Sequence, residues 1–303
     1  MIAHRSAGAA EASRPQNGAR LIVASFRERN DRKFRPKTGA ERPSQGRPGP
    51  HKAPHKSAHD KASSDWLWGW HAVEAALANP RREKPRRLLA SEDRARQLTE
   101  RFGQPPALEI ADAAQIARAL PAGAVHQGVA LKIDPLEPLP LDELAEDRSG
   151  PLVMLDQLTD PQNVGAIFRS AAAFGARGII LQDRNAPALA GALAKAAVGA
   201  VDILPHARVT NLSRALERLA DLGWRAVGLD GAAQETLEAV LDERPTVLVL
   251  GSEGEGIRRL VSEHCDALAR IPMPGGFESL NVSAAAAVAL YELSRPRGTG
   301  AKG

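Results

Sequence analysis

The stretch Ile271-Pro-Met-Pro-Gly-Gly-Phe-Glu-Ser-Leu-Asn-Val-Ser283, followed by Ala-Ala-Ala-Ala-Val-Ala-Leu-Tyr-Glu292, decides how this chain of 303 residues is interpreted. Its prolines and glycines exclude regular structure in the first part, whereas the alanine-rich part predicts a buried helix. Ser279 and Asn281 therefore lie where the loop meets the helix, and the free backbone N–H groups there can bind a small polar molecule without a metal. Capping of the helix by either residue is the plain alternative.

Upstream of this stretch, short apolar runs alternate with helical patterns, which predicts an α/β fold with a mainly parallel sheet covered on both faces. Strands are expected at 152–155, 178–181, 224–229, 246–250 and 268–273, and helices at 164–174, 188–198, 211–222 and 257–264. Such sheets bind ligands beyond the carboxyl ends of their strands. Three polar loops are predicted at those ends, at 156–163, 251–256 and 272–283.

Residues 65–134 are predicted to form a smaller α/β unit that begins at the aromatic run Trp66-Leu-Trp-Gly-Trp70. Its strands are expected at 86–90, 107–110 and 129–133, and its helices at 71–78, 92–102 and 111–120. His126 is expected in a turn before the last strand. Residues 135–150 carry several prolines and acids and are predicted to be a linker to the larger domain, 151–297, which a disordered tail, 298–303, follows.

Charge is distributed unevenly along the chain. The net charge is +4, yet residues 1–64 hold 14 Lys and Arg against 5 Asp and Glu, and the other residues hold 26 against 31. The first 64 residues also have too few apolar side chains to form a core, so they are predicted to be a disordered basic arm that contacts a polyanion. A solvated tail or a targeting presequence is the alternative.

Several functional classes are excluded by composition. No apolar run is long enough to span a bilayer, and the N-terminus has no apolar signal-peptide region, so a cytoplasmic protein without membrane contact is expected. The single cysteine, Cys265, has no partner for a disulfide or for a metal cluster, and a buried thiol is the expected role. No metal site is predicted.

The first polar loop leads into a helix that carries a candidate catalytic cation. Asn163 stands at a natural N-cap position, before Val164. On a helical wheel Arg169 lies opposite the apolar face and has small neighbours, which leaves room for a substrate. A solvent-facing arginine without a function is the alternative reading of Arg169.

The second polar loop, Gly251-Ser-Glu-Gly-Glu-Gly256, follows an apolar strand and invites comparison with a dinucleotide-binding loop. Its glycine spacing is wrong for that motif, and two carboxylates would oppose a pyrophosphate. Carboxylates in a glycine loop suit a group that is cationic or donates hydrogen bonds. Glu253 is therefore expected to orient Arg169.

The order and spacing of these motifs resemble a known family. Asn163 with Arg169, then Gly-Ser-Glu-Gly-Glu-Gly, then Ile-Pro-Met with Ser-Leu-Asn-Val-Ser are similar to the three successive motifs of the SpoU (TrmH) family of RNA ribose 2'-O-methyltransferases in the SPOUT superfamily. Gly-Trp-His-Ala-Val-Glu-Ala-Ala-Leu and His-Gln-Gly-Val-Ala resemble its L30e-like substrate-binding domain. Residues 255–266 further resemble the branch that methylates a guanosine of 23S ribosomal RNA, whereas Phe277 and the long arm depart from the commonest pattern.

The resemblance implies a C-terminal trefoil-knot domain, S-adenosylmethionine as cofactor, RNA as substrate and a homodimer. It places Gly251, Ile271 and Leu280 against the cofactor. It makes Asn163, Arg169, Glu253, Ser279 and Asn281 the catalytic set, with Arg169 activating the ribose 2'-hydroxyl. Transfer RNA as substrate remains an alternative, as does a non-catalytic RNA-binding ribosome-assembly factor. A nicotinamide-dependent enzyme has only the glycine loop in its favour.

Overall fold

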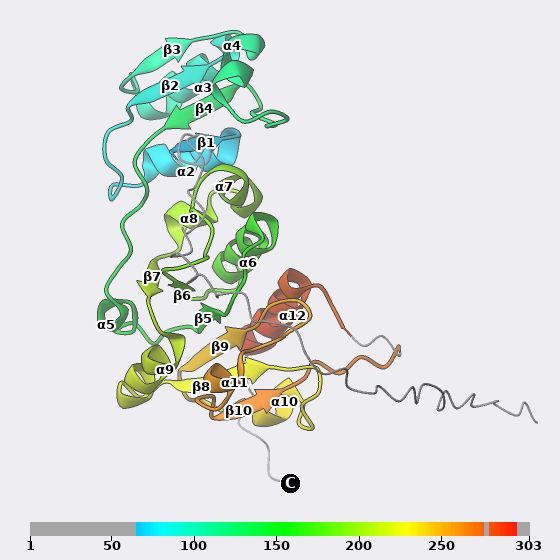
Figure 1. Ribbon diagram of the computed structural model, residues 1–303. Coiled ribbons are helices and arrows are strands. Elements are labelled where there is room, and N and C mark those ends of the chain that lie inside the picture. The colour runs from blue at the N-terminus through cyan, green and yellow to red at the C-terminus, as the bar shows by residue number, and fades with distance from the viewer. Residues whose placement is uncertain (1–64, 276–278, 296–303) are drawn as a thin grey trace, which may run out of the picture. The chain divides into compact units, whose positions relative to one another are not determined.

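The computed structural model describes residues 65–275 and 279–295 (Figure 1). The expected basic arm, the expected tail and Phe277 lie outside these residues. All described residues belong to one compact unit. The described part of that unit contains a large sheet and a small sheet, each with its own helices.

The large sheet has six parallel strands among the described residues, in the order β10-β8-β9-β5-β6-β7. The strands are β5 (Leu152–Leu155), β6 (Gly178–Gln182), β7 (His206–Val209), β8 (Arg225–Leu229), β9 (Thr246–Leu250) and β10 (Ala267–Ala269). Every residue of β5 and β9 is buried, as expected for central parallel strands. The mainly parallel sheet predicted from the sequence is confirmed. Strand β7 was not predicted, because His206 and Arg208 interrupt its apolar pattern.

Helices cover both faces of this sheet (Figure 1). Val153 and Leu155 pack in one core with α6 (Pro161–Ala173), α7 (Gly191–Ala197), α8 (Ala200–Ile203), α10 (Leu237–Val240) and α12 (Val282–Ser294). Leu152 and Met154 pack in a second core with α5 (Leu141–Leu144), α9 (Leu212–Asp221) and α11 (Arg259–Ser262). None of the helices in the described ranges is both long and apolar enough to cross a bilayer.

Residues 135–150, expected to be a linker, are part of the large domain. Leu144 of α5 is buried in the core, and the Leu139 backbone N–H donates to the His206 carbonyl at 2.8 Å. The Trp224 indole also donates to the Ala145 carbonyl at 3.1 Å. Leucines spaced among the prolines explain the difference, because they bury the segment against the sheet at its β7 edge.

The small sheet has the order β1-β4-β2-β3 and is mixed, since only β2 and β3 are parallel. Its elements are β1 (Trp66–Trp68), α2 (Trp70–Ala78), β2 (Arg87–Ala90), α3 (Glu92–Phe102), β3 (Leu108–Ile110), α4 (Ala113–Ala119) and β4 (Val129–Lys132). The first three residues of the aromatic run form strand β1, which the sequence analysis did not predict, and Trp70 begins α2. His126 lies in the expected turn, where its Nδ1 accepts from the Gly128 N–H at 3.1 Å.

The order of strands in the large sheet locates a binding crevice. From β5 the chain continues to β6 on one side, and from β9 it continues to β10 on the other side. Neighbouring strands that lead away in opposite directions leave a crevice at their carboxyl ends. The loops 156–163 and 251–256 follow β5 and β9, so both open into this crevice. The expected trefoil knot involves 272–283, a segment that is only partly described, and it stays a prediction.

Candidate functional site

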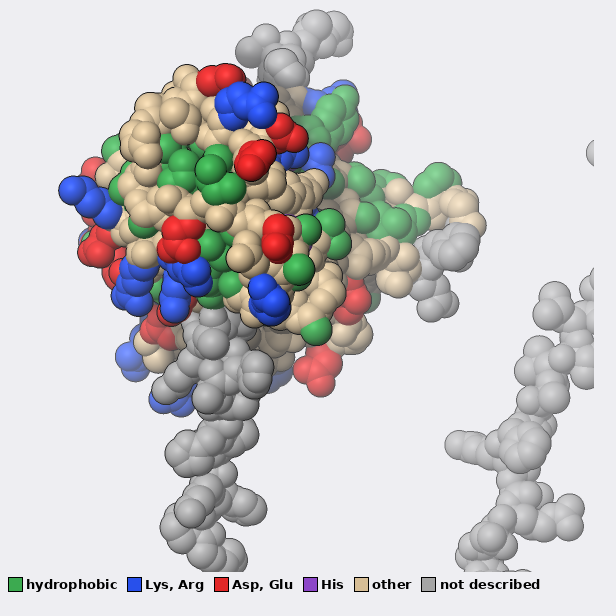
Figure 2. All heavy atoms as spheres, turned by 90° about the horizontal axis from the view of Figure 1, so that it is seen from above, with side chains coloured by type: hydrophobic (Ala, Val, Ile, Leu, Met, Phe, Trp, Pro, Cys, Tyr) green, Lys and Arg blue, Asp and Glu red, His purple; other side chains and the backbone are tan. Residues whose placement is uncertain are grey.

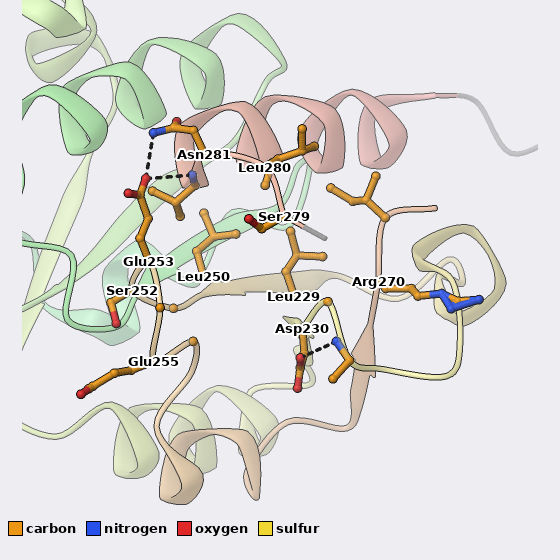
Figure 3. A pocket seen from close by; sticks show the side chains of 18 of the residues that line it. Leu229, Asp230, Leu250, Ser252, Glu253, Glu255, Arg270, Ser279, Leu280 and Asn281 are labelled. Carbon is orange, nitrogen blue, oxygen red and sulfur yellow. Dashed lines mark hydrogen bonds between the residues drawn. The ribbon is translucent and has the colours of Figure 1, made fainter. Parts of the chain in front are cut away.

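The three polar loops meet at one carboxylate oxygen. Glu253 Oε1 accepts a hydrogen bond from Asn281 Nδ2 at 2.8 Å (Figure 3). It accepts another from Asn163 Nδ2 at 3.2 Å. It also accepts from the Val282 backbone N–H at 3.3 Å, and Asn281 Nδ2 donates to Asn163 Oδ1 at 2.9 Å. Asn163, Glu253 and Asn281, here called the amide–carboxylate cluster, therefore come together at the edge of the sheet where the three polar loops were expected.

The predicted capping role of Asn163 is wrong. Helix α6 begins at Pro161, and its N-cap is Asp160, whose carboxylate accepts from the backbone N–H groups of Gln162 at 3.3 Å and Asn163 at 3.0 Å. Proline suits the first helical position because its missing N–H has no partner there. Since Asp160 caps the helix, the side-chain amide of Asn163 is available to Glu253.

Asn281 caps helix α12, one of the readings that the sequence left open, and it also contacts the two other residues of the cluster. Its Oδ1 caps α12 by accepting from the Ser283 N–H at 2.9 Å and the Ala284 N–H at 3.3 Å. Its Nδ2 donates into the amide–carboxylate cluster. The cap fixes the orientation of the amide, so the start of α12 is tied directly to the site.

Arg169 does not contact Glu253, and the expectation that Glu253 orients it is wrong in this structure. The side chain is exposed and makes no hydrogen bond or ion pair with the described residues. The donors around Glu253 Oε1 are amides and a backbone N–H. Arg169 follows Asn163 on the same helix, on the side away from the buried face of Ile167 and Phe168. It is therefore available to an incoming ligand.

The glycine loop after β9 closes into a tight ring. The backbones of Ser252 and Gly256 exchange two hydrogen bonds, at 3.1 and 3.0 Å. A Cβ on Gly251 would lie 2.0 Å from the Gly256 carbonyl carbon, so only glycine allows this closure. At Gly254 and Gly256 a Cβ would meet nothing within 4 Å, so the backbone there is open to a ligand.

A pocket of about 740 Å³ opens beside this ring. Its walls include Gly251, Ile271, Ser279 and Leu280, which the sequence assigned to the site. Leu229 and Leu250 add apolar surface, and Asp230 and Arg270 lie at the end away from the amide–carboxylate cluster (Figure 3). The volume lies within the usual range for small-molecule sites, and the mixture of apolar walls with a few polar groups is typical of them.

An ion pair that the sequence analysis did not identify holds the glycine loop in place. Asp156, at the end of β5, is fully buried and accepts from Arg258 at the backbone N–H, 2.9 Å, and at Nε, 2.8 Å. Arg258 Nη2 lies 2.7 Å from the same carboxylate. The only signal in the sequence was an acid directly after a buried strand, because its partner lies 102 residues away.

Cys265 supplies no reactive thiolate. Burial raises its pKa to about 12, and the nearby Asp266 and Asp156 act in the same direction. Its Sγ donates to the Val261 carbonyl at 3.5 Å. The described residues also contain no group of three His, Cys, Asp or Glu side chains that could hold a metal ion. What the site offers is amide, carboxylate and guanidinium chemistry beside an open backbone.

Two family models match the chain. The model described as the SpoU rRNA Methylase family matches residues 150–291, and the model for RNA 2'-O ribose methyltransferase substrate binding matches residues 66–139. The second match covers the small sheet, and the first covers the large sheet together with all three loops of the site.

Relatives of known sequence and structure agree with these matches. The chain is 40% identical over 251 residues to the 23S rRNA (guanosine-2'-O-)-methyltransferase RlmB of Pseudomonas aeruginosa, which covers 77% of this chain and 98% of that protein. It is 42% identical over 181 residues to an uncharacterized tRNA/rRNA methyltransferase of Mycolicibacterium gilvum, and this alignment spans only 58% of that relative's length. The crystal structure of the SpoU methyltransferase AviRb from Streptomyces viridochromogenes with AdoMet has a TM-score of 0.66 at 25% identity, covering 81% of this chain and all of that one.

The buried ion pair leads to a prediction about stability. Replacing Arg258 by Met leaves the Asp156 carboxylate buried with a single backbone donor, and we expect a loss of about 1–3 kcal/mol in the free energy of unfolding. Urea denaturation followed by circular dichroism measures this loss.

The matched control is Arg259→Met at the next position. Arg259 is largely exposed and pairs only with Glu263 one helical turn away, so its replacement should leave the urea midpoint nearly unchanged. Equal midpoints for the two variants would show that the Asp156–Arg258 pair does not stabilise the fold.

Proposed function

The chain belongs to the SpoU family of RNA methyltransferases, and from this premise we propose that it transfers a methyl group from S-adenosylmethionine to a ribose 2'-hydroxyl in RNA, at a guanosine of 23S ribosomal RNA. The observation that carries the proposal is the amide–carboxylate cluster, which lies at the switch point of the parallel sheet and beside the pocket.

The residues around the pocket suit the cofactor. The backbone is open at Gly254 and Gly256, where a side chain would occupy the space of a ligand. Gly251, Ile271 and Leu280 would hold the cofactor through backbone groups and apolar packing, as the resemblance implies. The carboxylates of Glu253 and Glu255 at the rim favour a cationic ligand. When bound, the cofactor supplies an electrophilic methyl group on a positively charged sulfur.

The side chains around the cluster would position and activate the ribose. An arginine keeps its proton in proteins, so Arg169 serves as a cation that stabilises the 2'-oxygen while its proton leaves. Asn163 and Asn281 hold Glu253, since the three hydrogen bonds that it accepts all end on Oε1. The other oxygen, Oε2, has no hydrogen-bond partner among the described residues, and Glu253 is thereby a candidate to accept the proton. Ser279 is exposed at the pocket wall and would contact the ribose.

RNA selection is expected to depend on shape more than on charge. Figure 2 looks from above the view of Figure 1, and on that face Lys and Arg side chains are interspersed with Asp and Glu. We propose that residues 65–134 dock structured RNA and that the basic residues of 1–64 add salt-sensitive phosphate contacts. We also propose that the protein acts in the cytoplasm, because its proposed substrate is ribosomal RNA.

A second copy of the chain would complete the enzyme as a homodimer. Helix α12 exposes Val288 at 44% and Tyr291 at 55%, and these two residues lie one helical turn apart. The Tyr291 ring also packs edge to face on Phe174, with centroids 5.9 Å apart. Exposed apolar groups that cluster in this way favour burial against a partner. Sedimentation velocity at micromolar concentration should therefore give the mass of a dimer, and Tyr291→Arg should shift it to that of a monomer; a monomeric unaltered protein would contradict this proposal.

The decisive experiment for the function maps the modified atom. The protein is incubated with S-adenosylmethionine labelled in its methyl group and, separately, with 23S ribosomal RNA and transfer RNA that lack these methyl groups. We expect label on the 2'-oxygen of one guanosine in the ribosomal RNA. Label on a base would contradict ribose methylation, and label in transfer RNA alone would overturn the substrate. An assembly factor without catalysis would transfer no label and, in calorimetric titration, bind no S-adenosylmethionine.

Arg169→Ala tests the chemistry. Because Arg169 is exposed and has no partner among the described residues, we expect the variant to fold normally and to bind S-adenosylmethionine, yet to lose at least about 100-fold in kcat. Single-turnover transfer to RNA measures the rate, and calorimetry measures cofactor binding.

Two further variants make this test specific. Arg177 directly precedes β6, at the amino end of the strand, whereas the site lies at the carboxyl ends of the strands. It pairs with Asp147, and Arg177→Ala should leave the rate unchanged. Glu253→Gln keeps a carbonyl oxygen in the cluster but removes the basic carboxylate, so a large loss of rate would assign proton acceptance to Glu253. Near-normal turnover of folded Arg169→Ala would remove Arg169 from the catalytic set.

A further inference from the structure

The small-sheet unit is docked closely on helices α7 and α8 of the large domain. Ala194 of α7 is buried in the core of the small unit. At Gly199, just before α8, a Cβ would lie 2.9 Å from Ala75 Cβ and 3.0 Å from the His71 carbonyl oxygen. Any side chain at Gly199 would therefore push α2 away, so the two parts touch at backbone distance.

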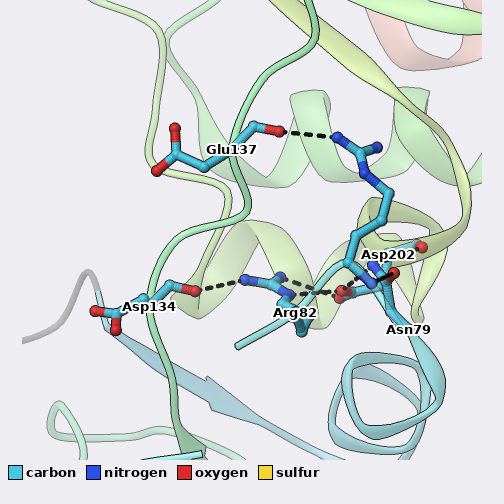
Figure 4. A network of polar contacts seen from close by, with 6 residues as sticks. Asn79, Arg82, Asp134, Glu137 and Asp202 are labelled. Atoms are coloured by element: carbon cyan, nitrogen blue, oxygen red, sulfur yellow. Dashed lines mark hydrogen bonds and ion pairs between the residues drawn. The ribbon is translucent and has the colours of Figure 1, made fainter. Parts of the chain in front are cut away.

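Beside this contact lies a buried polar network that joins the same two parts (Figure 4). Arg82, which follows α2, pairs with Asp202 of α8 through Nε–Oδ1 at 2.7 Å and Nη2–Oδ2 at 3.1 Å. Both side chains are only 3% exposed. Arg82 Nη1 donates to the Asp134 carbonyl at 2.8 Å, and Asn79 Nδ2 donates to Asp202 Oδ1 at 3.0 Å. We call Asn79, Arg82, Asp134 and Asp202 the Arg82 clamp.

The clamp is not needed to complete the core of either part. Each sheet has its own buried apolar clusters, and Ala194 is the one buried residue of the described large domain that joins a cluster of the small unit. A buried ion pair is seldom more stabilising than apolar residues of the same volume, but its bidentate geometry defines an orientation. The geometry of the Arg82 clamp therefore points to a role in alignment.

The docked helices lead directly to the catalytic arginine. Helix α7 packs on α6 at Gly165, where a Cβ would lie 2.5 Å from the Leu193 carbonyl oxygen and 2.7 Å from Ala196 Cβ. Gly165 lies between Asn163 and Arg169 on α6. The small unit is thus linked to the active site through two tightly packed contacts, one at Gly199 and one at Gly165.

We propose that the Arg82 clamp determines which nucleotide is methylated, by fixing the separation between the RNA-docking unit and Arg169. This inference rests on the proposed function, and it makes Arg82 and Asp202 positioning residues for specificity. RNA held on the small unit presents its ribose at a set distance. If the unit moves, other nucleotides reach the site and the correct one is presented less often.

The first experiment measures the separation without using activity. Spin labels are attached at Ala117→Cys on α4 and Ala220→Cys on α9, both exposed, while burial keeps Cys265 unreactive. The labelled chain is diluted with an excess of unlabelled chain so that distances within one protomer are read, and we expect one narrow distance distribution for the otherwise unaltered chain. Arg82→Glu places two carboxylates together and should broaden the distribution, and the exchange Arg82→Glu with Asp202→Arg should narrow it again. A narrow, unshifted distribution for Arg82→Glu alone would show that the clamp does not hold the parts together.

The second experiment maps the methylated nucleotide for the same variants. Arg82→Glu should lower kcat/KM for ribosomal RNA by about 10- to 100-fold, since displacement of about 1 Å can cost that much, and should place label on neighbouring nucleotides. The exchanged pair should restore the single site. The proposal would be overturned if Arg82→Glu broadened the distance distribution but the variant still methylated the same nucleotide at the same rate.

Controls separate this outcome from failure of the function itself. Arg218→Glu breaks an exposed ion pair with Asp142 inside the large domain and should change neither the distance nor the site. Spreading of label with Arg218→Glu as well would show a general loss of fidelity and would contradict a special role for the clamp. An unaltered protein that transfers no methyl group would refute the proposed function, whatever the distances show.

Discussion

One carboxylate oxygen, Glu253 Oε1, connects the parts of this protein on which the site depends. Its three donors are Asn163 in the first turn of α6, Asn281 at the N-cap of α12 and the backbone N–H of Val282, and they are separated by up to 90 residues from Glu253 in the chain. An acceptor shared by three donors defines the positions of all of them more narrowly than separate pairs would. The parallel sheet brings the three loops to one edge, but this oxygen decides how they face one another.

A second carboxylate, that of Asp156, helps to fix the loop that carries Glu253. Asp156 lies wholly inside the protein and is satisfied by Arg258, which follows the glycine ring. The ring is therefore held at its start by β9 and at its end by this ion pair, with Gly251 allowing the close return of the chain. Burying such a charge carries a large desolvation cost, which the hydrogen bonds from Arg258 offset. Here the ion pair orients the loop that carries Glu253.

Most of the fold could be predicted from the sequence because the apolar composition of the central strands shows that they are buried. Residues 247–250 of β9 are an uninterrupted apolar run, and such a run bounded by turn residues predicts a strand buried on both faces. Strand β7 escaped prediction because His206 and Arg208 conceal its pattern, and Asp160 escaped as a cap because the more suggestive Asn163 stands three residues later. The loops of the site were predictable, whereas the pairing within them was not. Whether Glu253 contacts Arg169 or Asn281 depends on how α6 and α12 are oriented, and no local sequence pattern determines that orientation.

The double use of Asn281 has a consequence for how this protein can change. One amide group begins a helix with its oxygen and takes part in the site with its nitrogen. Aspartate or serine would also cap the helix, but neither brings an N–H donor, and glutamine would bring the donor on a chain too long for the cap. None of these three side chains both caps the helix and supplies an N–H donor to the site. A substitution of Asn281 that keeps the cap can preserve the fold while the reaction is lost. A substitution that removes the cap loses the reaction as well, so during evolution the reaction is lost more easily than the fold.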